Sequence, residues 1–245
     1  MSIFIAEWLG TLLLIFLGNG VVASTLLHES KGEKGGWLAI TVGWGIAVAV
    51  AVYSVGWVSG GHLNPAVTMG LWAAGKTSLH LVPYYLVGQM VGAMMGSALV
   101  WIAYRPHWSK TPDPTLKLLC FCTRPAIRSL WNNFMVEVMA TAVLLFGILS
   151  IFNIHNGIGS GVGPCAVGVL ILSIGLSLGG PTGFAINPAR DLGPRLMHAW
   201  LPIAGKRDSD WGYAWVPIAG PLIGAILGAL LYQFVIEPLP ELMNF

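Results

Sequence analysis

The sequence has few charged residues for its length. Only 9% of its 245 residues are charged, whereas 56% are hydrophobic, and the mean hydropathy is +0.75. Soluble domains carry about 25% charged residues, so this composition excludes an ordinary soluble protein. We therefore expect an integral membrane protein, with most of the chain in or against the lipid bilayer.

Clusters of chemically reactive residues are also scarce. The basic residues are scattered and form no run, so the net charge of +2 gives no reason to expect nucleic acid as a partner. Cys120, Cys122 and Cys165 show neither metal-ligand spacing nor an easy pairing, and we expect free thiols. We find no phosphate-binding loop, metal cluster or Ser/His/Asp grouping, and no cleavable signal peptide. The sequence therefore predicts no enzymatic activity, no metal and no cofactor.

Six apolar stretches are long enough to cross a bilayer as helices, which takes about 20 residues each. Tryptophans stand near several of their ends, where amphipathic rings settle at the lipid headgroups. We expect the spans at approximately 3–27, 37–57, 80–104, 131–153, 162–180 and 211–236.

Two shorter apolar stretches, 65–74 and 188–199, each begin directly after an asparagine. Asn is a good N-cap residue, and Pro fits the first helical position because its missing N–H has no partner there. Both stretches are too short to span the bilayer, so we expect re-entrant half-helices surrounded by protein or by a watery cavity. The repeated motifs are Asn64-Pro65-Ala66 and Asn187-Pro188-Ala189.

The two halves of the chain repeat this pattern. Glu7 in the first span corresponds to Glu137 in the fourth, and each half carries three spans and one half-helix. Because three is odd, the second half enters the membrane in the opposite orientation, which predicts an inverted repeat. We expect one transmembrane domain over 1–245, with halves at approximately 1–104 and 131–245. The polar linker 105–130 contains prolines that argue against a helix there.

The two half-helices point their N-termini at the middle of the membrane. Their dipoles together form a positive region that opposes protons and cations, and the amides of Asn64 and Asn187 can donate hydrogen bonds to a passing oxygen. The simpler reading is that both asparagines only cap their helices.

Arg190 lies in the first turn of the second half-helix. Placing an arginine at the centre of a bilayer costs about 2.5–3.5 kcal/mol, so its side chain normally faces a partner or a water-filled cavity. An ion pair with the adjacent Asp191 is not expected, because neighbouring helical residues point about 100° apart. Asp191 is expected to stabilise the helix N-terminus or to hold a loop.

Glu7 and Glu137 allow two interpretations. They could carry protons in a transporter, or they could accept hydrogen bonds from the irregular backbone before each half-helix. Their symmetric placement, one in each half, favours structural support. His62 is likewise expected to be a hydrogen-bonded strut beside the motif rather than a proton switch.

With two Asn-Pro-Ala motifs and an arginine after the second, the chain resembles the major intrinsic protein (aquaporin) superfamily over essentially its whole length. Asp191 directly after Arg190 is typical of the glycerol-facilitator, or aquaglyceroporin, branch. The resemblance implies six spans with two half-helices in an inverted repeat, homotetramers with one pore per subunit, and no bound cofactor. It also implies a passive channel for glycerol, other small neutral solutes and some water, which excludes ions and protons.

The resemblance further implies a narrow constriction outside the midplane. Its residues would be Trp44, Gly175, Phe184 and Arg190, with Gly175 leaving room where water-selective members usually carry histidine. Backbone carbonyls would line the path at Gly60, Gly61, His62, Leu63, Gly183, Phe184, Ala185 and Ile186.

The family topology places both termini in the cytoplasm, in a multi-pass protein of the cell membrane. Loops 28–36, 105–130 and 199–210 then face outward, although they carry most of the Lys and Arg, and the cytoplasmic side keeps little beyond Lys76. The positive-inside rule alone predicts the reverse orientation, and we adopt the family topology because a long loop can translocate regardless of its charge. A basic outer surface would attract weak acids such as lactic acid, which would cross in the neutral form.

Two other functions remain open from the sequence. A proton-coupled secondary transporter would use Glu7, Glu137 and Asp191 as a proton relay. A water-selective aquaporin is disfavoured by Gly175 and Asp191, and a structural junction protein would not need an arginine in the membrane.

Overall fold

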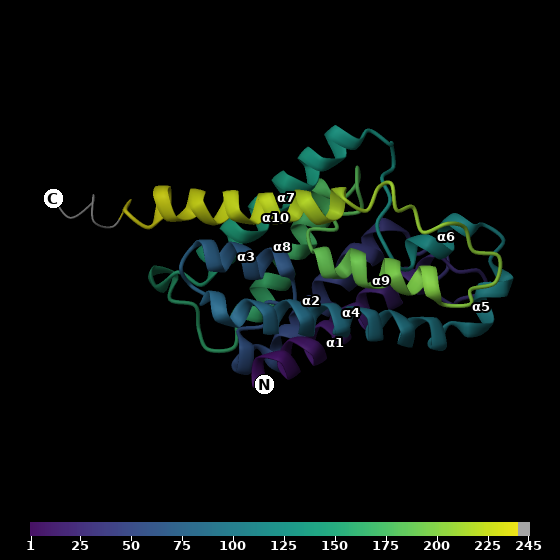
Figure 1. Cartoon of the computed structure of the whole chain (residues 1–245), viewed down its shortest axis with the longest axis horizontal. Helices are drawn as coiled ribbons and strands as arrows, with labels where there is room; N and C mark the ends of the chain where they lie inside the picture. Colours follow the sequence, from purple (N-terminus) through teal and green to yellow (C-terminus); the bar gives the residue numbers. More distant parts are fainter. Residues whose placement is uncertain (240–245) are drawn as a thin grey trace.

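The computed structural model describes residues 1–239, and residues 240–245 of the expected domain lie outside the described part. Within the described residues the chain is entirely helical, with no strand. The long helices run side by side along the length of the molecule (Figure 1). This architecture confirms the fold class predicted from the sequence.

Six long helices form the body of the protein. Five apolar segments have the length and composition to cross a membrane, and the sixth, α8, has 16 residues. At 1.5 Å per residue α8 is about 24 Å long, somewhat short of the roughly 30 Å hydrocarbon core. The six are α1 (Ser2–Leu26), α2 (Gly36–Ser59), α4 (Val82–Ala103), α7 (Leu130–Ile151), α8 (Gly163–Leu178) and α10 (Val216–Leu231), with a π-helical turn, Tyr232–Ile236, after α10.

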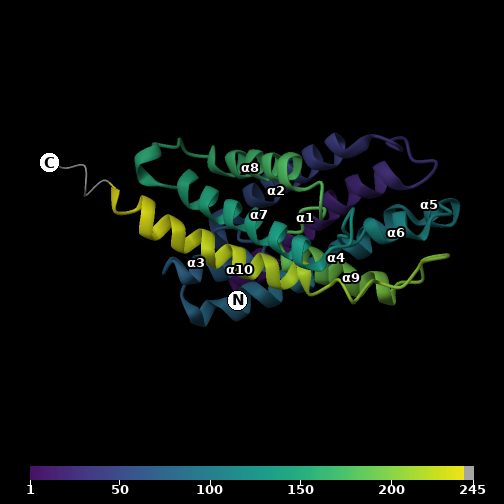
Figure 2. The same ribbon diagram turned by 90° about the horizontal axis from the view of Figure 1, so that it is seen from above.

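The two short helices expected after the asparagines are α3 (Pro65–Ala73) and α9 (Pro188–Trp200). Each begins at a proline, and the Asn before it accepts hydrogen bonds from N–H groups of the first turn through its side-chain oxygen. Asn64 and Asn187 are therefore N-caps, as their residue type favours. Seen from two directions, α3 and α9 lie on opposite sides of the middle of the molecule (Figures 1 and 2).

Each half-helix packs against the last long helix of the other half. α3 lies on α10, where a Cβ added to Gly70 would come within 3.0 Å of the Ala225 carbonyl oxygen. α9 lies on α4, where a Cβ on Gly193 would come within 2.8 Å of the Ala93 Cβ. The two halves are thus joined through both half-helices, and each half-helix packs less extensively against the last long helix of its own repeat.

Glycine rows bring long helices together within each half. A Cβ on Gly92 of α4 would lie 2.3 Å from the Trp8 carbonyl oxygen of α1, and one on Gly224 of α10 would lie 2.2 Å from the Val138 carbonyl oxygen of α7. Only glycine allows backbones to approach this closely in lipid. The rows are Gly88, Gly92 and Gly96 in α4, and Gly220, Gly224 and Gly228 in α10.

The linker between the halves corrects one expectation. It contains two short helices, α5 (Arg105–Lys110) and α6 (Pro114–Leu119), where prolines argued for irregular structure. In both helices the proline occupies the first turn, where it needs no hydrogen-bond partner, so it starts the helix instead of breaking it. Asp113 caps α6 by accepting a hydrogen bond from the Thr115 N–H at 2.7 Å.

Candidate pore and its constriction

The two half-helices are hydrogen-bonded to each other at their N-termini. The Asn64 side-chain amide donates to the Ile186 carbonyl at 2.8 Å, and the Asn187 amide donates to the Leu63 carbonyl at 2.8 Å. Each asparagine therefore uses its oxygen to cap its own helix and one amide hydrogen to hold the opposite loop. The second amide hydrogen of each remains as a donor, because an amide nitrogen carries two.

The loops before the half-helices have unusual backbone angles. Leu63, Phe184 and Ile186 adopt φ values of 52°, 39° and 44°, although none is glycine. Left-handed φ is rare for such side chains and costs free energy, so the surrounding structure must hold the loops in place. Two consecutive backbone N–H groups of each loop are buried and turned toward the same point, so they require buried partners.

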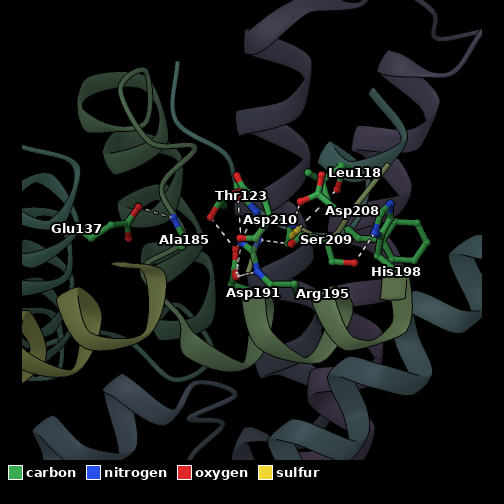
Figure 3. A network of polar contacts seen from close by, with 12 residues as sticks. Leu118, Thr123, Glu137, Ala185, Asp191, Arg195, His198, Asp208, Ser209 and Asp210 are labelled. Carbon is green, nitrogen blue, oxygen red and sulfur yellow. Dashed lines mark hydrogen bonds and ion pairs between the residues drawn. The ribbon is translucent and has the colours of Figure 1, made fainter. Parts of the chain in front are cut away.

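Glu7 and Glu137 supply those partners. Glu7 accepts hydrogen bonds from the N–H groups of His62 and Leu63 at 3.0 and 2.7 Å. In the second half, Glu137 accepts from two consecutive N–H groups, of which that of Ile186 lies at 2.8 Å. The other, from Ala185, is drawn in Figure 3. Both carboxylates are buried, so each satisfies donors that lipid could not.

Additional neutral groups surround Glu7. The carboxylate also accepts hydrogen bonds from the Ser59 hydroxyl and from the Gln89 amide. Gln89 donates in turn to the Thr68 hydroxyl, which lies 3.1 Å from the His62 ring nitrogen. His62 therefore belongs to a buried network at the base of α3, which fits the expected strut.

Two cavities lie near the half-helix junction, and Asn64 and Asn187 line the narrower of the two. The wide cavity has a volume of about 350 Å³ and is lined by residues of the linker, including Thr123 and Arg124, and by Gly183. The narrow cavity has a volume of about 100 Å³ and is lined mainly by apolar side chains of α2, α7 and α8. Residues of the two loops also line the narrow cavity, namely Gly60, Gly61, His62, Leu63, Ala185 and Ile186.

Trp44, Phe184 and Arg190 are the residues that line both cavities. The Arg190 guanidinium carbon lies 4.3 Å from the centroid of the Trp44 ring, over its face. Arg190 is only 6% exposed, and its Nη1 has no hydrogen-bond partner among the described residues. The boundary between the cavities thus combines two aromatic faces with unpaired hydrogen-bond donors.

Gly175 lies behind this boundary and does not line either cavity. A Cβ at this position would lie 2.9 Å from Thr41 Cγ2 and 3.1 Å from Phe184 Cζ. The expected free space beside Gly175 is therefore occupied by the Phe184 ring. The absence of a side chain at Gly175 allows Phe184 to pack there, with Trp37 packed edge-on against the Phe184 ring.

Asp191 is paired with an arginine that sequence reasoning did not identify. Arg195 donates to Asp191 Oδ1 through Nε and Nη2, both at 2.8 Å, and both side chains are fully buried. Asp191 Oδ2 accepts from the Thr123 N–H and hydroxyl, at 2.8 and 2.7 Å. The remaining Arg195 donors bind the carbonyls of Ser209, Asp210 and Thr123, so three segments meet at one guanidinium (Figure 3). The four-residue spacing of Asp191 and Arg195 on α9 was the available signal.

Two further cations hold the loop after α9. Lys206 donates to the carbonyls of His198, Ala199 and Leu201, each at 2.7 Å, and thereby closes the C-terminus of α9. Arg128 bonds Asp210, and this hydrogen bond raises the pKa of Arg128. Arg195 joins this loop to the wall of the wide cavity, because it also donates to the carbonyl of Thr123.

The sequence and the structure were compared with those of known proteins. Residues 1–232 match the major intrinsic protein family. The chain is 57% identical to a probable glycerol uptake facilitator protein of Thermotoga maritima, over 96% of this chain and all of that protein. It is 41% identical to a D/L-lactic acid transporter of Lactiplantibacillus plantarum, over 92% and 94% of the two chains. An X-ray structure of the aquaglyceroporin from Plasmodium falciparum superposes with a TM-score of 0.88 at 35% identity, covering 98% of both chains.

Proposed function

Since this chain belongs to the major intrinsic protein family, we propose that it is a passive channel for glycerol and other small neutral solutes. One structural observation carries this proposal. Two cavities share Trp44, Phe184 and Arg190 in their lining, and the narrow one is also lined by Asn64 and Asn187 at the paired half-helix N-termini. A path built in this way needs no bound cofactor and no chemical step.

The constriction suits a linear polyol. Its CH groups can lie against the rings of Trp44 and Phe184, while its hydroxyls bind the free donors of Arg190. These contacts replace hydration that the solute loses, and each polar group left unpaired would cost about 1–3 kcal/mol. Ions lose far more hydration and find no matching shell, and the positive half-helix termini repel cations and protons. We propose Trp44, Gly175, Phe184 and Arg190 as the selectivity filter, with Gly175 acting by seating Phe184.

The remaining residues support this path in the proposal. Asn64 and Asn187 hold the loops together at the junction, and Glu7 and Glu137 fix the loop backbones so that carbonyls face the path. Asp191 supports the path indirectly, because it binds Arg195 and so holds that side chain in place. The carbonyls proposed as acceptors are those of Gly60, Gly61, His62, Leu63, Gly183, Phe184, Ala185 and Ile186.

The proposed oligomeric state, membrane location and orientation are those expected from the family. We propose a homotetramer with one pore per subunit in the cell membrane, with cytoplasmic termini and the wide cavity facing outward. Lactic acid in its neutral form is a second candidate solute, because a relative with 41% identity is described as a D/L-lactic acid transporter. Water is expected to pass at a moderate rate, because it gains nothing from the aromatic faces.

Stopped-flow light scattering on proteoliposomes tests the proposal. Liposomes with the protein should take up glycerol faster than empty ones, with a smaller gain in water flux, and should keep an imposed pH gradient. Proton movement coupled to glycerol movement would overturn the channel in favour of a secondary transporter. Fast water flux without glycerol flux would instead indicate a water-selective pore.

A further inference from the structure

The wide cavity is lined by two guanidinium groups. Arg124 lines it from the linker and is exposed, and Arg190 lines it at the boundary with the narrow cavity. No Asp or Glu is among the described residues that line it. The cavity is therefore a concave space with uncompensated positive charge, and such a shape concentrates anions.

Asp191 and Glu137 act on Arg190, but both are buried, their oxygens accept hydrogen bonds from other groups, and neither lines the cavity. Asp191, directly after Arg190, accepts two hydrogen bonds from Arg195 and two from Thr123, and is fully buried. An adjoining groove, which shares Leu26, Trp37 and Ile40 with the wide cavity, carries one acid and one base and so adds no net charge. These are Glu33 and Lys34.

Arg190 keeps a donor available for a ligand. Its side chain is 94% buried, it faces both cavities, and its Nη1 has no partner in the described chain. An oxyanion at the boundary would give this nitrogen a charge-assisted hydrogen bond, and arginine is well suited to bind carboxylate in this way. The cavity volume of about 350 Å³ is within the range of small-molecule sites.

We propose that the wide cavity binds small hydroxy-carboxylate anions, and that such an anion blocks the pore. The carboxylate pairs with Arg124 and Arg190, while the hydroxyls occupy the place of a glycerol molecule approaching the constriction. The anion does not proceed, because the walls of the narrow cavity are largely apolar, and the partial positive charge at the half-helix N-termini does not replace the hydration that a full negative charge would lose there. The blockade rests on the proposed glycerol flux, whereas the binding itself does not.

Glycerate, which is glycerol with one terminal CH₂OH oxidised to a carboxylate, is the probe that tests blockade. Glycerol influx into proteoliposomes is measured with glycerate at equal concentration on both sides, so that protein orientation and osmotic pressure do not matter. Sodium chloride of the same ionic strength and the neutral glyceramide serve as controls. We expect glycerate to slow glycerol influx in a saturable manner, and the two controls to have little effect. Equal slowing by chloride or glyceramide would overturn the proposal.

Two variants locate the site. Arg124→Gln should weaken inhibition by glycerate about tenfold, as expected for loss of one hydrogen bond to a charged group. The matched control is Arg105→Gln, because Arg105 is also an exposed linker arginine but stacks on Trp101 and does not line the cavity. Each variant is referred to its own flux without glycerate. Equal inhibition of Arg124→Gln and Arg105→Gln would overturn the site.

Titration calorimetry of the purified full-length protein with glycerate separates this inference from the channel proposal. Binding heat that is weakened in Arg124→Gln and retained in Arg105→Gln supports the anion site even if glycerol flux fails. Absence of binding to the unmodified protein overturns the anion site even if glycerol flux is fast.

Discussion

Each residue at the constriction has a counterpart in the other repeat, at the same distance along the chain from that repeat's Asn-Pro-Ala asparagine. The counterparts carry no charge and no side-chain hydrogen-bond donor, and all of them line the narrow cavity. Trp44 corresponds to Val167, Gly175 to Val52, Phe184 to Gly61 and Arg190 to Val67.

The backbone frame, by contrast, is nearly the same in both repeats. Asn64 and Asn187 each donate to the opposite loop at 2.8 Å, and Glu7 and Glu137 each accept from two consecutive loop N–H groups. The symmetric elements therefore hold the path in position. The charged donor that could discriminate between solutes, Arg190, has only an apolar counterpart, Val67, in the other repeat.

The support behind the two half-helices differs as well. Thr68 of α3 belongs to a network of neutral groups around Glu7, whereas Asp191, its counterpart in α9, forms a buried ion pair with Arg195. Removing one member of a buried ion pair leaves the other charge buried without a partner. This costs more free energy than removing one neutral hydrogen-bonding group. The second repeat should therefore be the more sensitive to single substitutions.

The largest effect is expected from breaking that ion pair. Arg195→Met should destabilise the protein by about 3–5 kcal/mol, because the Asp191 carboxylate stays buried without its cation. The double variant Asp191→Asn with Arg195→Met should recover part of this loss. The midpoint of thermal unfolding in detergent measures both, and Gln89→Leu in the first repeat should cost less. A loss for Arg195→Met no larger than for Gln89→Leu would contradict the difference between the repeats.

The second prediction concerns a variant in which one constriction residue is replaced by the residue at the corresponding position of the other repeat. Arg190→Val, which copies Val67, removes a full positive charge from the boundary between the cavities. Proton flux should rise by up to about a thousandfold, since two charges about 4 Å apart repel by roughly 4 kcal/mol near a protein surface, and each 1.4 kcal/mol is about tenfold in rate. Decay of a pH gradient across proteoliposomes, followed with an internal dye, measures it. A gradient as stable as that of the unmodified protein would assign the proton barrier to the half-helix dipoles alone.

The third prediction concerns the position that seats Phe184. Gly175→His places a Cβ 3.1 Å from the Phe184 ring and a polar ring beyond it, so Phe184 must move. Glycerol flux should fall about tenfold while water flux changes little, as expected when a pocket is narrowed by a few atoms. Gly20→Ala is the control, because a Cβ there meets no atom within 4 Å. Unchanged glycerol flux in a folded Gly175→His protein would place the filter elsewhere.

The smallest expected effect distinguishes the two supporting carboxylates. Glu7→Gln should cost about 1 kcal/mol more stability than Glu137→Gln, because Glu7 has two side-chain hydrogen-bond donors, Ser59 and Gln89, whereas Glu137 has one in Thr182. Thermal unfolding of the two variants in the same detergent gives the difference. The reverse order would show that the loop before α9 carries more strain than its hydrogen bonds reveal.

Local signals in the sequence were sufficient for the frame. Hydropathy predicted the spans, and Asn followed by Pro predicted where α3 and α9 begin, because capping depends on adjacent residues. The proline-containing linker was misread for the opposite reason: Pro106 and Pro114 start α5 and α6, and sequence alone did not distinguish a helix start from a break.

Contacts between distant segments were not predictable in this way. The bond from Asn187 to Leu63 and the contacts of Arg195 with Thr123 and Ser209 join residues that no periodicity relates. The seating of Phe184 against Gly175 likewise depends on packing between a loop and α8.

The crossed packing of the half-helices has a consequence for synthesis. α3 lies on α10, so the surface that receives Gly70 is made about 160 residues after α3 itself, which at 5–20 residues per second is roughly 8–30 s of translation. During that time the N-terminal half is in the membrane without the helix that covers α3. α9 has no such delay, because α4 is already present when it emerges. α9 can therefore pack against α4 as soon as it is made, whereas α3 reaches its final position only when α10 inserts.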